Sequence, residues 1–271
     1  MGEAKRKRRK HASIIENAPG CIYCAASRPA AQIDHMPPRA MFRLSQRPRG
    51  LEFPSCAICN QGTSRLDVIA TLMARTFPGI ATKDDAREWN KVTAEAERVA
   101  PGIMREMVMP RPAMERMMHA YGVTDPEQAM FRAAGPILSA HMQAFAAKTG
   151  FALHYEKTGT VVPADGRVQV RWFTSEEVMN RKLPDSLIRS LDTRQPLRQG
   201  RITSDGLFEY GHVPYAGNPD VPLYFAKVRE AFLAVAFVAD EVGELPFSPL
   251  NLATFAPGDL TEPLHDRIYE E

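Results

Sequence analysis

All four cysteines of the 271-residue chain occur in two Cys-x-x-Cys pairs, Cys21/Cys24 and Cys56/Cys59. A gap of two residues lets both thiolates of a tight turn face one ion, and two such turns complete the tetrahedral site that zinc prefers. The competing interpretations are two redox pairs or two disulfides. A redox Cys-x-x-Cys normally accompanies a βαβ pattern, which we do not find here. The four cysteines therefore predict one structural zinc ion.

Polar residues suited to hydrolysis stand close to these pairs in the sequence. The 31 residues between the pairs exceed the spacing of a zinc ribbon, so we expect a further structural unit there, and it contains Asp34 followed by His35. Asn60 directly follows the second pair. An imidazole with an ordinary pKa can take a proton from water near neutral pH. A carboxylate and an amide oxygen suit a hard divalent cation.

In combination, Asp34-His35-Met36-Pro37-Pro38 and Cys56-Ala57-Ile58-Cys59-Asn60 resemble the HNH, or ββα-metal, endonucleases in their four-cysteine zinc form. The resemblance covers about residues 18–70 and implies that the zinc is structural. It also implies that His35 is the general base and that Asp34 and Asn60 bind a catalytic Mg²⁺ or Mn²⁺. The family's middle Asn, which braces the loop that carries the base, is not found in the stretch 49–55.

The charge of the chain is unevenly distributed. Residues 1–75 hold thirteen Lys or Arg against five Asp or Glu, a net charge of +8, and the remaining residues carry −6. The guanidinium group suits phosphate oxygens. The charge therefore predicts a polyanion-binding face, and the resemblance implies DNA as the partner, with RNA not excluded, although the basic run at residues 5–10 is equally well explained as a solvated tail. The predicted nucleic-acid-binding arginines are Arg39, Arg43, Arg47, Arg49 and Arg65.

The remaining patterns predict an α+β chain in which a small zinc-stapled ββα-metal (HNH) module precedes helices and an antiparallel β-sheet region. We divide it into a basic N-terminal arm, mobile or a frayed helix, at 1–12, the HNH zinc module at 13–75, a helical region at 76–150, and an antiparallel β-rich region packed on the helices at 151–271. Helical periodicity covers Cys59–Arg75, Asp84–Val99, Met114–Tyr121 and Pro126–Lys148, the last with a break at Gly135-Pro136. Predicted strands are Phe151–Glu156, Arg167–Phe173, Leu207–Val213, Pro222–Val228 and Phe232–Val238.

Other classes of protein lack support in the sequence. The N-terminus has no apolar signal region, and no apolar run approaches the roughly 20 residues of a membrane-spanning helix, so we expect a cytoplasmic protein without a membrane partner. The large C-terminal part contains no second catalytic motif, and we expect it to select substrate or partner, or to mediate homo-oligomers. The other six histidines have no companion ligands at metal spacing, and we interpret them as structural or solvated.

The sequence therefore favours a metal-dependent HNH endonuclease that hydrolyses DNA phosphodiester bonds. One alternative is a non-catalytic, zinc-stabilised module that binds nucleic acid or protein. A pure binding module has no reason to keep Asp34, His35 and Asn60 together, and this trio is what separates the two hypotheses. A nuclease that acts on RNA or on one restricted substrate is a third possibility.

Overall fold

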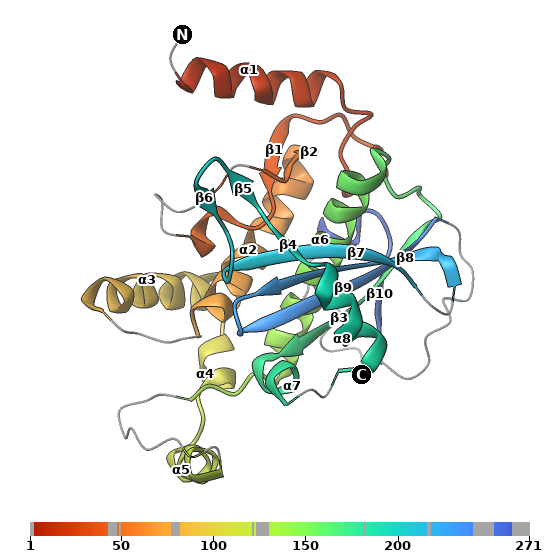
Figure 1. Ribbon diagram of the computed structural model, residues 1–271. Helices are drawn as coiled ribbons and strands as arrows, with labels where there is room; N and C mark the ends of the chain where they lie inside the picture. Colours follow the sequence, from red (N-terminus) through yellow and green to blue (C-terminus); the bar gives the residue numbers. More distant parts are fainter. Residues whose placement is uncertain are drawn as a thin grey trace.

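The computed structural model describes residues 3–42, 48, 50–76, 82–120, 122, 130–180, 183–215, 218–240 and 252–261. Its elements form a mixed fold in which a β-hairpin and a helix precede further helices and an antiparallel sheet (Figure 1). The predicted α+β class is therefore confirmed. No helix in the described ranges is both long enough and apolar enough to cross a membrane.

The basic run forms helix α1 (Glu3–Glu16), which lies above the hairpin of β1 (Gln32–His35) and β2 (Glu52–Ser55) (Figure 1). Lys, Arg, Ala and Glu dominate this segment, and all four favour helix. The helix is attached to the hairpin, because the Lys10 ammonium donates a hydrogen bond to Glu52 at 2.8 Å. The predicted frayed helix is thus a continuous helix that extends into the predicted zinc module.

The unit between the two cysteine pairs is an antiparallel hairpin. Strands β1 (Gln32–His35) and β2 (Glu52–Ser55) pair with His35 opposite Glu52, and the short helix η1 (Arg39–Met41) follows β1. Helix α2 (Ala57–Arg75) begins directly after β2. The predicted helix Cys59–Arg75 is confirmed, with its start two residues earlier.

Four further helices precede the large sheet: α3 (Lys83–Val99), α4 (Ile103–Met107), α5 (Arg111–Ala120) and α6 (Pro136–Thr158). The predicted break at Gly135-Pro136 is the start of α6, with Pro136 in its first turn, where proline is tolerated because its missing N–H has no helical partner. Residues 130–135 are not helical, and 123–129 lie outside the described residues.

The predicted strand Phe151–Glu156 is wrong, because these residues continue α6 to Gly159, which ends it with φ 73°. Helix α6 is buried on nearly all sides between α2 and the sheet, so its sequence lacks the one-sided apolar stripe that identifies a surface helix. Gly150 allows α6 to approach the sheet closely, since a Cβ at this position would lie 2.6 Å from the Cβ of Ala236 in the sheet. The predicted boundary at residue 150 therefore falls inside a helix.

The other four predicted strands are confirmed, and they form most of a six-stranded antiparallel sheet with the order β10-β3-β9-β8-β7-β4. Helix α6 packs on one face of this sheet, and α7 and α8 cover the other. The remaining elements are β3 (Arg167–Thr174), α7 (Ser175–Met179), α8 (Asp185–Ser190), η2 (Leu191–Thr193), β4 (Gln195–Pro196), β5 (Arg198–Gln199), β6 (Ile202–Thr203), β7 (Phe208–Tyr215), β8 (Asn218–Val228), β9 (Phe232–Ala239), β10 (Ala253–Phe255) and η3 (Asp259–Thr261).

One hydrophobic core runs through the cysteine module, the helices and the sheet. The C-terminal segment also returns to the cysteine module. The amide of Gly258 donates to the carbonyl of Tyr23 at 2.8 Å, and a Cβ at Gly62 in α2 would lie 3.1 Å from the carbonyl of Leu260. The candidate site is therefore supported by segments from both ends of the chain.

Candidate zinc centre and candidate active site

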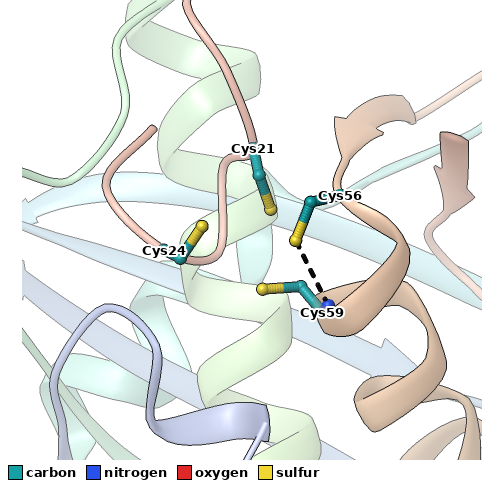
Figure 2. A group of neighbouring side chains, drawn as sticks. All are labelled: Cys21, Cys24, Cys56 and Cys59. Carbon is teal, nitrogen blue, oxygen red and sulfur yellow. Dashed lines mark hydrogen bonds between the residues drawn. The ribbon is translucent and has the colours of Figure 1, made fainter. Parts of the chain in front are cut away.

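The four cysteines converge, as their spacing predicts. Cys21 and Cys24 come from the turn after α1, while Cys56 and Cys59 come from the first turn of α2 (Figure 2). Cys56 is the N-cap of α2, and its sulfur accepts a hydrogen bond from the amide of Cys59 at 3.3 Å. All four are buried free thiols whose sulfurs lie within 4.8 Å of one another. Four tetrahedral sulfurs at the usual zinc distance would be about 3.8 Å apart, so this group can bind a metal such as zinc.

The electrostatics of the cluster favour loss of one thiol proton, that of Cys21, whereas the pKa of Cys24 is raised, mainly by burial. A hydrogen bond from the Cys59 thiol, opposed by burial, lowers the pKa of Cys21 to about 5. The pKa of Cys59 is raised in turn, because its proton is held between the two sulfurs. The guanidinium of Arg28 forms a hydrogen bond to Cys56 and places positive charge beside the cluster. A metal cation binds the deprotonated thiolates and displaces the shared protons.

The backbone of the first cysteine turn has a conformation that the sequence did not reveal. Ala25 and Ala26 have φ of 50° and 56°, in the left-handed region that non-glycine residues seldom adopt. Hydrogen bonds hold this turn closed, from Ala26 to the carbonyl of Cys21 at 3.0 Å and from Ser27 to that of Cys24 at 2.9 Å. The turn aims both sulfurs at α2.

Asp34 points into the protein. Its carboxylate accepts hydrogen bonds from the Tyr23 hydroxyl at 2.5 Å and from the backbone amide of His35 at 2.8 Å, and it lies 3.0 Å from the Lys148 ammonium. Burial alone raises the pKa of Asp34, but the Lys148 charge and these hydrogen bonds outweigh it and lower the pKa below its ordinary value. Asp34 is therefore an ionised carboxylate inside the core.

The cation beside Asp34 was missed by the sequence analysis. Lys148 lies in the middle of α6 with a fully buried side chain, and its ammonium is also 2.7 Å from Asp67 of α2. Burial lowers the pKa of Lys148, but the two carboxylates more than offset this effect and raise it. Asp67 therefore belongs to the same network. The signal in the sequence is a lysine within the apolar stretch 144–153.

His35 faces the other side of β1, towards α1. Its Nε2 atom contacts the guanidinium of Arg39 and lies 3.6 Å from Glu52 Oε1. The ring of His11 from α1 packs edge-on at 6.0 Å between centroids, and its Nε2 atom is 3.5 Å from the same Glu52 oxygen. The structure thus brings together His35 and Arg39, which the sequence selected, with His11 and Glu52, which it did not.

The third member of the predicted trio has yet another environment. Asn60 lies in the first turn of α2, and its side-chain amide donates to Gln32 at 2.6 Å. The side chains of Asp34, His35 and Asn60 therefore contact different side chains: Tyr23 and Lys148, Arg39 and Gln32, respectively. The role of Asp34 and Asn60 as ligands of a catalytic cation stays a prediction.

Two of the five predicted nucleic-acid-binding arginines lie in the described residues. Arg39 is exposed on η1, next to His35. Arg65 is half-buried on α2, where burial lowers its pKa. The other three, Arg43, Arg47 and Arg49, lie outside the described residues.

Comparison with known proteins adds no assignment to this geometry. The chain matches no protein-family model, no curated protein and no solved structure. The function must therefore be argued from the residues and their contacts alone.

Proposed function

We propose that this protein is a metal-dependent HNH-type endonuclease that hydrolyses DNA phosphodiester bonds, with zinc on the four cysteines. The observation that carries the proposal is the placement of His35 on a short hairpin with one cysteine pair before it and the other after it. Zinc bound there joins the first turn, the hairpin and α2 into one rigid unit. A reactive side chain needs such support to hold its geometry.

The contacts of His35 suit a general base. The Arg39 guanidinium can only donate, so the Nε2 atom that it contacts carries a lone pair rather than a proton. Such a nitrogen can take a proton from an attacking water. Arg39 is exposed and can also contact a phosphate oxygen beside the imidazole.

A hard divalent cation, Mg²⁺ or Mn²⁺, would stabilise charge on the phosphate and on the leaving oxygen. The resemblance assigns it to Asp34 and Asn60. For Asp34 this role requires the carboxylate to turn from Lys148 and Tyr23, whereas Asn60 must release Gln32.

The distribution of charge supports a polyanionic substrate. Helix α1 exposes most of its basic run next to the hairpin that carries His35. Each phosphate that Lys or Arg neutralises releases counterions, so binding should weaken steeply with salt. The exposed bases of α1 are Lys5, Arg6, Arg8, Arg9 and Lys10.

The test is nicking of supercoiled plasmid in Mg²⁺ and in Mn²⁺. Loss of a general base typically costs about 10²- to 10⁴-fold in rate, so His35→Ala should be slower by at least about 100-fold. His119→Ala is the matched control, because His119 is an exposed histidine on α5. Equal rates for wild type and His35→Ala would overturn the proposal.

The second candidate is a non-catalytic module that binds nucleic acid. It is favoured by the internal pairing of Asp34, whose carboxylate is already satisfied by Lys148 and Tyr23. Binding to duplex DNA and to RNA should be measured alongside cleavage of both. Salt-sensitive binding without cleavage of either by wild type, in both metals, would establish this second function.

A further inference from the structure

The cluster on the outer side of the hairpin has the geometry of a metal site. Glu52 Oε1 lies 3.5 Å from His11 Nε2 and 3.6 Å from His35 Nε2, and the three atoms are all within 4.8 Å of one another. Donors bound at about 2.1 Å to one tetrahedral ion stand about 3.4 Å apart. The spacing is too long for hydrogen bonds and suits three ligands of a single cation.

The state of each donor agrees with this geometry. His11 Nε2 is buried and makes no hydrogen bond. A buried polar atom normally has a partner, and its absence requires an explanation. Lys10 bonds the other carboxylate oxygen, Oε2, which leaves Oε1 directed at the two imidazoles.

We propose that His11, His35 and Glu52 bind one transition-metal ion of the Zn²⁺ or Co²⁺ class, separate from the ion of the four cysteines. Two imidazole nitrogens and one carboxylate oxygen suit such ions, whereas Mg²⁺ prefers oxygen ligands and keeps its waters. The site therefore selects a different metal from the one that the nuclease reaction uses.

The fold holds these donors in place through three elements. The β1–β2 register sets His35 opposite Glu52, and α1 adds His11 one residue after the lysine that anchors it. Glu52 has a side chain only 5% exposed, so its orientation is fixed by packing. The exposed Arg39 guanidinium now contacts His35 Nε2, and the ion replaces it there.

The consequence for activity rests on the proposed nuclease function. An ion on His35 Nε2 occupies the lone pair that would take the proton from water. The metal-loaded protein is then inactive, although Mg²⁺ is present. Helix α1 would thus make hydrolysis sensitive to transition metals through His11.

The test uses the full chain with its four-cysteine site filled with zinc, titrated with Co²⁺ and followed by calorimetry and visible absorption. Wild type should bind one further equivalent. His11→Ala and Glu52→Gln should each weaken binding by at least about tenfold, since even an outer-shell partner contributes 10- to 100-fold. Arg39→Ala should bind more tightly, because it removes the competing cation, and His119→Ala should match wild type.

Circular dichroism and retained zinc would show that each variant is folded. The proposal is overturned if wild type takes up no further Co²⁺, or if folded His11→Ala and Glu52→Gln bind it as wild type does. These binding results do not depend on plasmid nicking, so a failure of the nuclease proposal would be seen separately. If nicking occurs, added Co²⁺ should inhibit wild type at lower concentration than His11→Ala.

Discussion

The charged groups on the two faces of strand β1 have opposite kinds of surroundings. On the inner face, Asp34 is bonded by Tyr23 and paired with the fully buried Lys148. On the outer face, the neighbouring residue His35 contacts the exposed Arg39 guanidinium. Glu52 Oε1 faces the His11 and His35 imidazoles but lies too far from both for a hydrogen bond. Two adjacent residues of one strand therefore have unlike surroundings, because side chains alternate across a strand.

The difference suggests that the inner face of β1 stabilises the fold, whereas the outer face binds ligands. Burying charge is costly unless partners satisfy it, and the inner cluster meets this condition with one ammonium between two carboxylates. That cluster links the first cysteine turn, β1, α2 and α6. The outer cluster keeps a buried nitrogen without a hydrogen bond and a basic helix beside it. Ligands are expected on the outer face, and stability is expected to depend on the inner one.

Loss of zinc should have the largest effect, because it affects both faces. Cys59→Ser removes one of the four proposed zinc ligands, at the start of α2, so the hairpin and the helix should lose their common support. Structural zinc supplies folding free energy directly. We expect the free energy of unfolding to fall by more than about 4 kcal/mol, beyond the range of most single substitutions.

Thermal unfolding and zinc content measure this effect, with Ser64→Ala on the exposed side of α2 as the control. Cobalt binding on the outer face should be lost together with the zinc. A Cys59→Ser protein with unchanged zinc and unchanged melting temperature would contradict the assignment of the four-cysteine site.

Lys148→Ala should disrupt the inner cluster of Asp34, Lys148 and Asp67 and leave the outer cluster intact. It leaves Asp34 and Asp67 in the core without their cation, and breaking a buried ion pair typically costs about 3–5 kcal/mol. Urea unfolding should show this loss, while the outer cluster of the folded variant still binds Co²⁺. Lys157→Ala, an exposed lysine on the same helix, is the control. Equal losses for the two lysines would show that the inner cluster does not support the fold.

The pH dependence of stability tests the same cluster more finely. Burial and the nearby charge of Asp34 raise the pKa of Asp67 from 3.8 to about 7, against the opposing effect of Lys148. Between these values the folded protein holds a proton that the unfolded chain has released. Stability should therefore fall as pH rises from about 4 to about 7. The lowered pKa of Asp34 affects a different pH range. Its contribution to stability is lost only in more acidic solution, as the pH falls through the lowered pKa.

Asp67→Asn should remove this slope. Unfolding in urea between about pH 5 and about pH 7 would compare the variant with wild type. The difference should be modest, because the Asp67 side chain is still 22% exposed. A variant with the same slope as wild type would show that another group titrates there.

The sequence predicted those features of the structure that depend on residue types and their spacing along the chain. Two Cys-x-x-Cys pairs predicted the cysteine cluster, and the long spacing between them predicted a further structural unit, which the structure shows to be the β1–β2 hairpin. Alternating apolar residues predicted four strands of the large sheet, because a strand with a period of two needs no distant information.

The contacts that distinguish the two faces of β1 are not local. Lys148 is 114 residues from Asp34, and Lys10 is 42 residues from Glu52. No spacing rule pairs residues so far apart. The strand predicted at 151–156 failed for a related reason, since a helix buried on nearly all sides has no one-sided apolar stripe to recognise.

Lys10→Ala should have the smallest effect. Its ammonium pairs with Glu52, but the Lys10 side chain is 54% exposed, and such pairs typically contribute about 0–1 kcal/mol. Urea unfolding at low and high salt should show a small loss that shrinks with salt, because screening weakens exposed pairs. Lys5→Ala on the same helix is the control. If Lys10→Ala were as costly as Lys148→Ala at both salt concentrations, the depth of burial would not be what separates the two faces, and α1 would be part of the core.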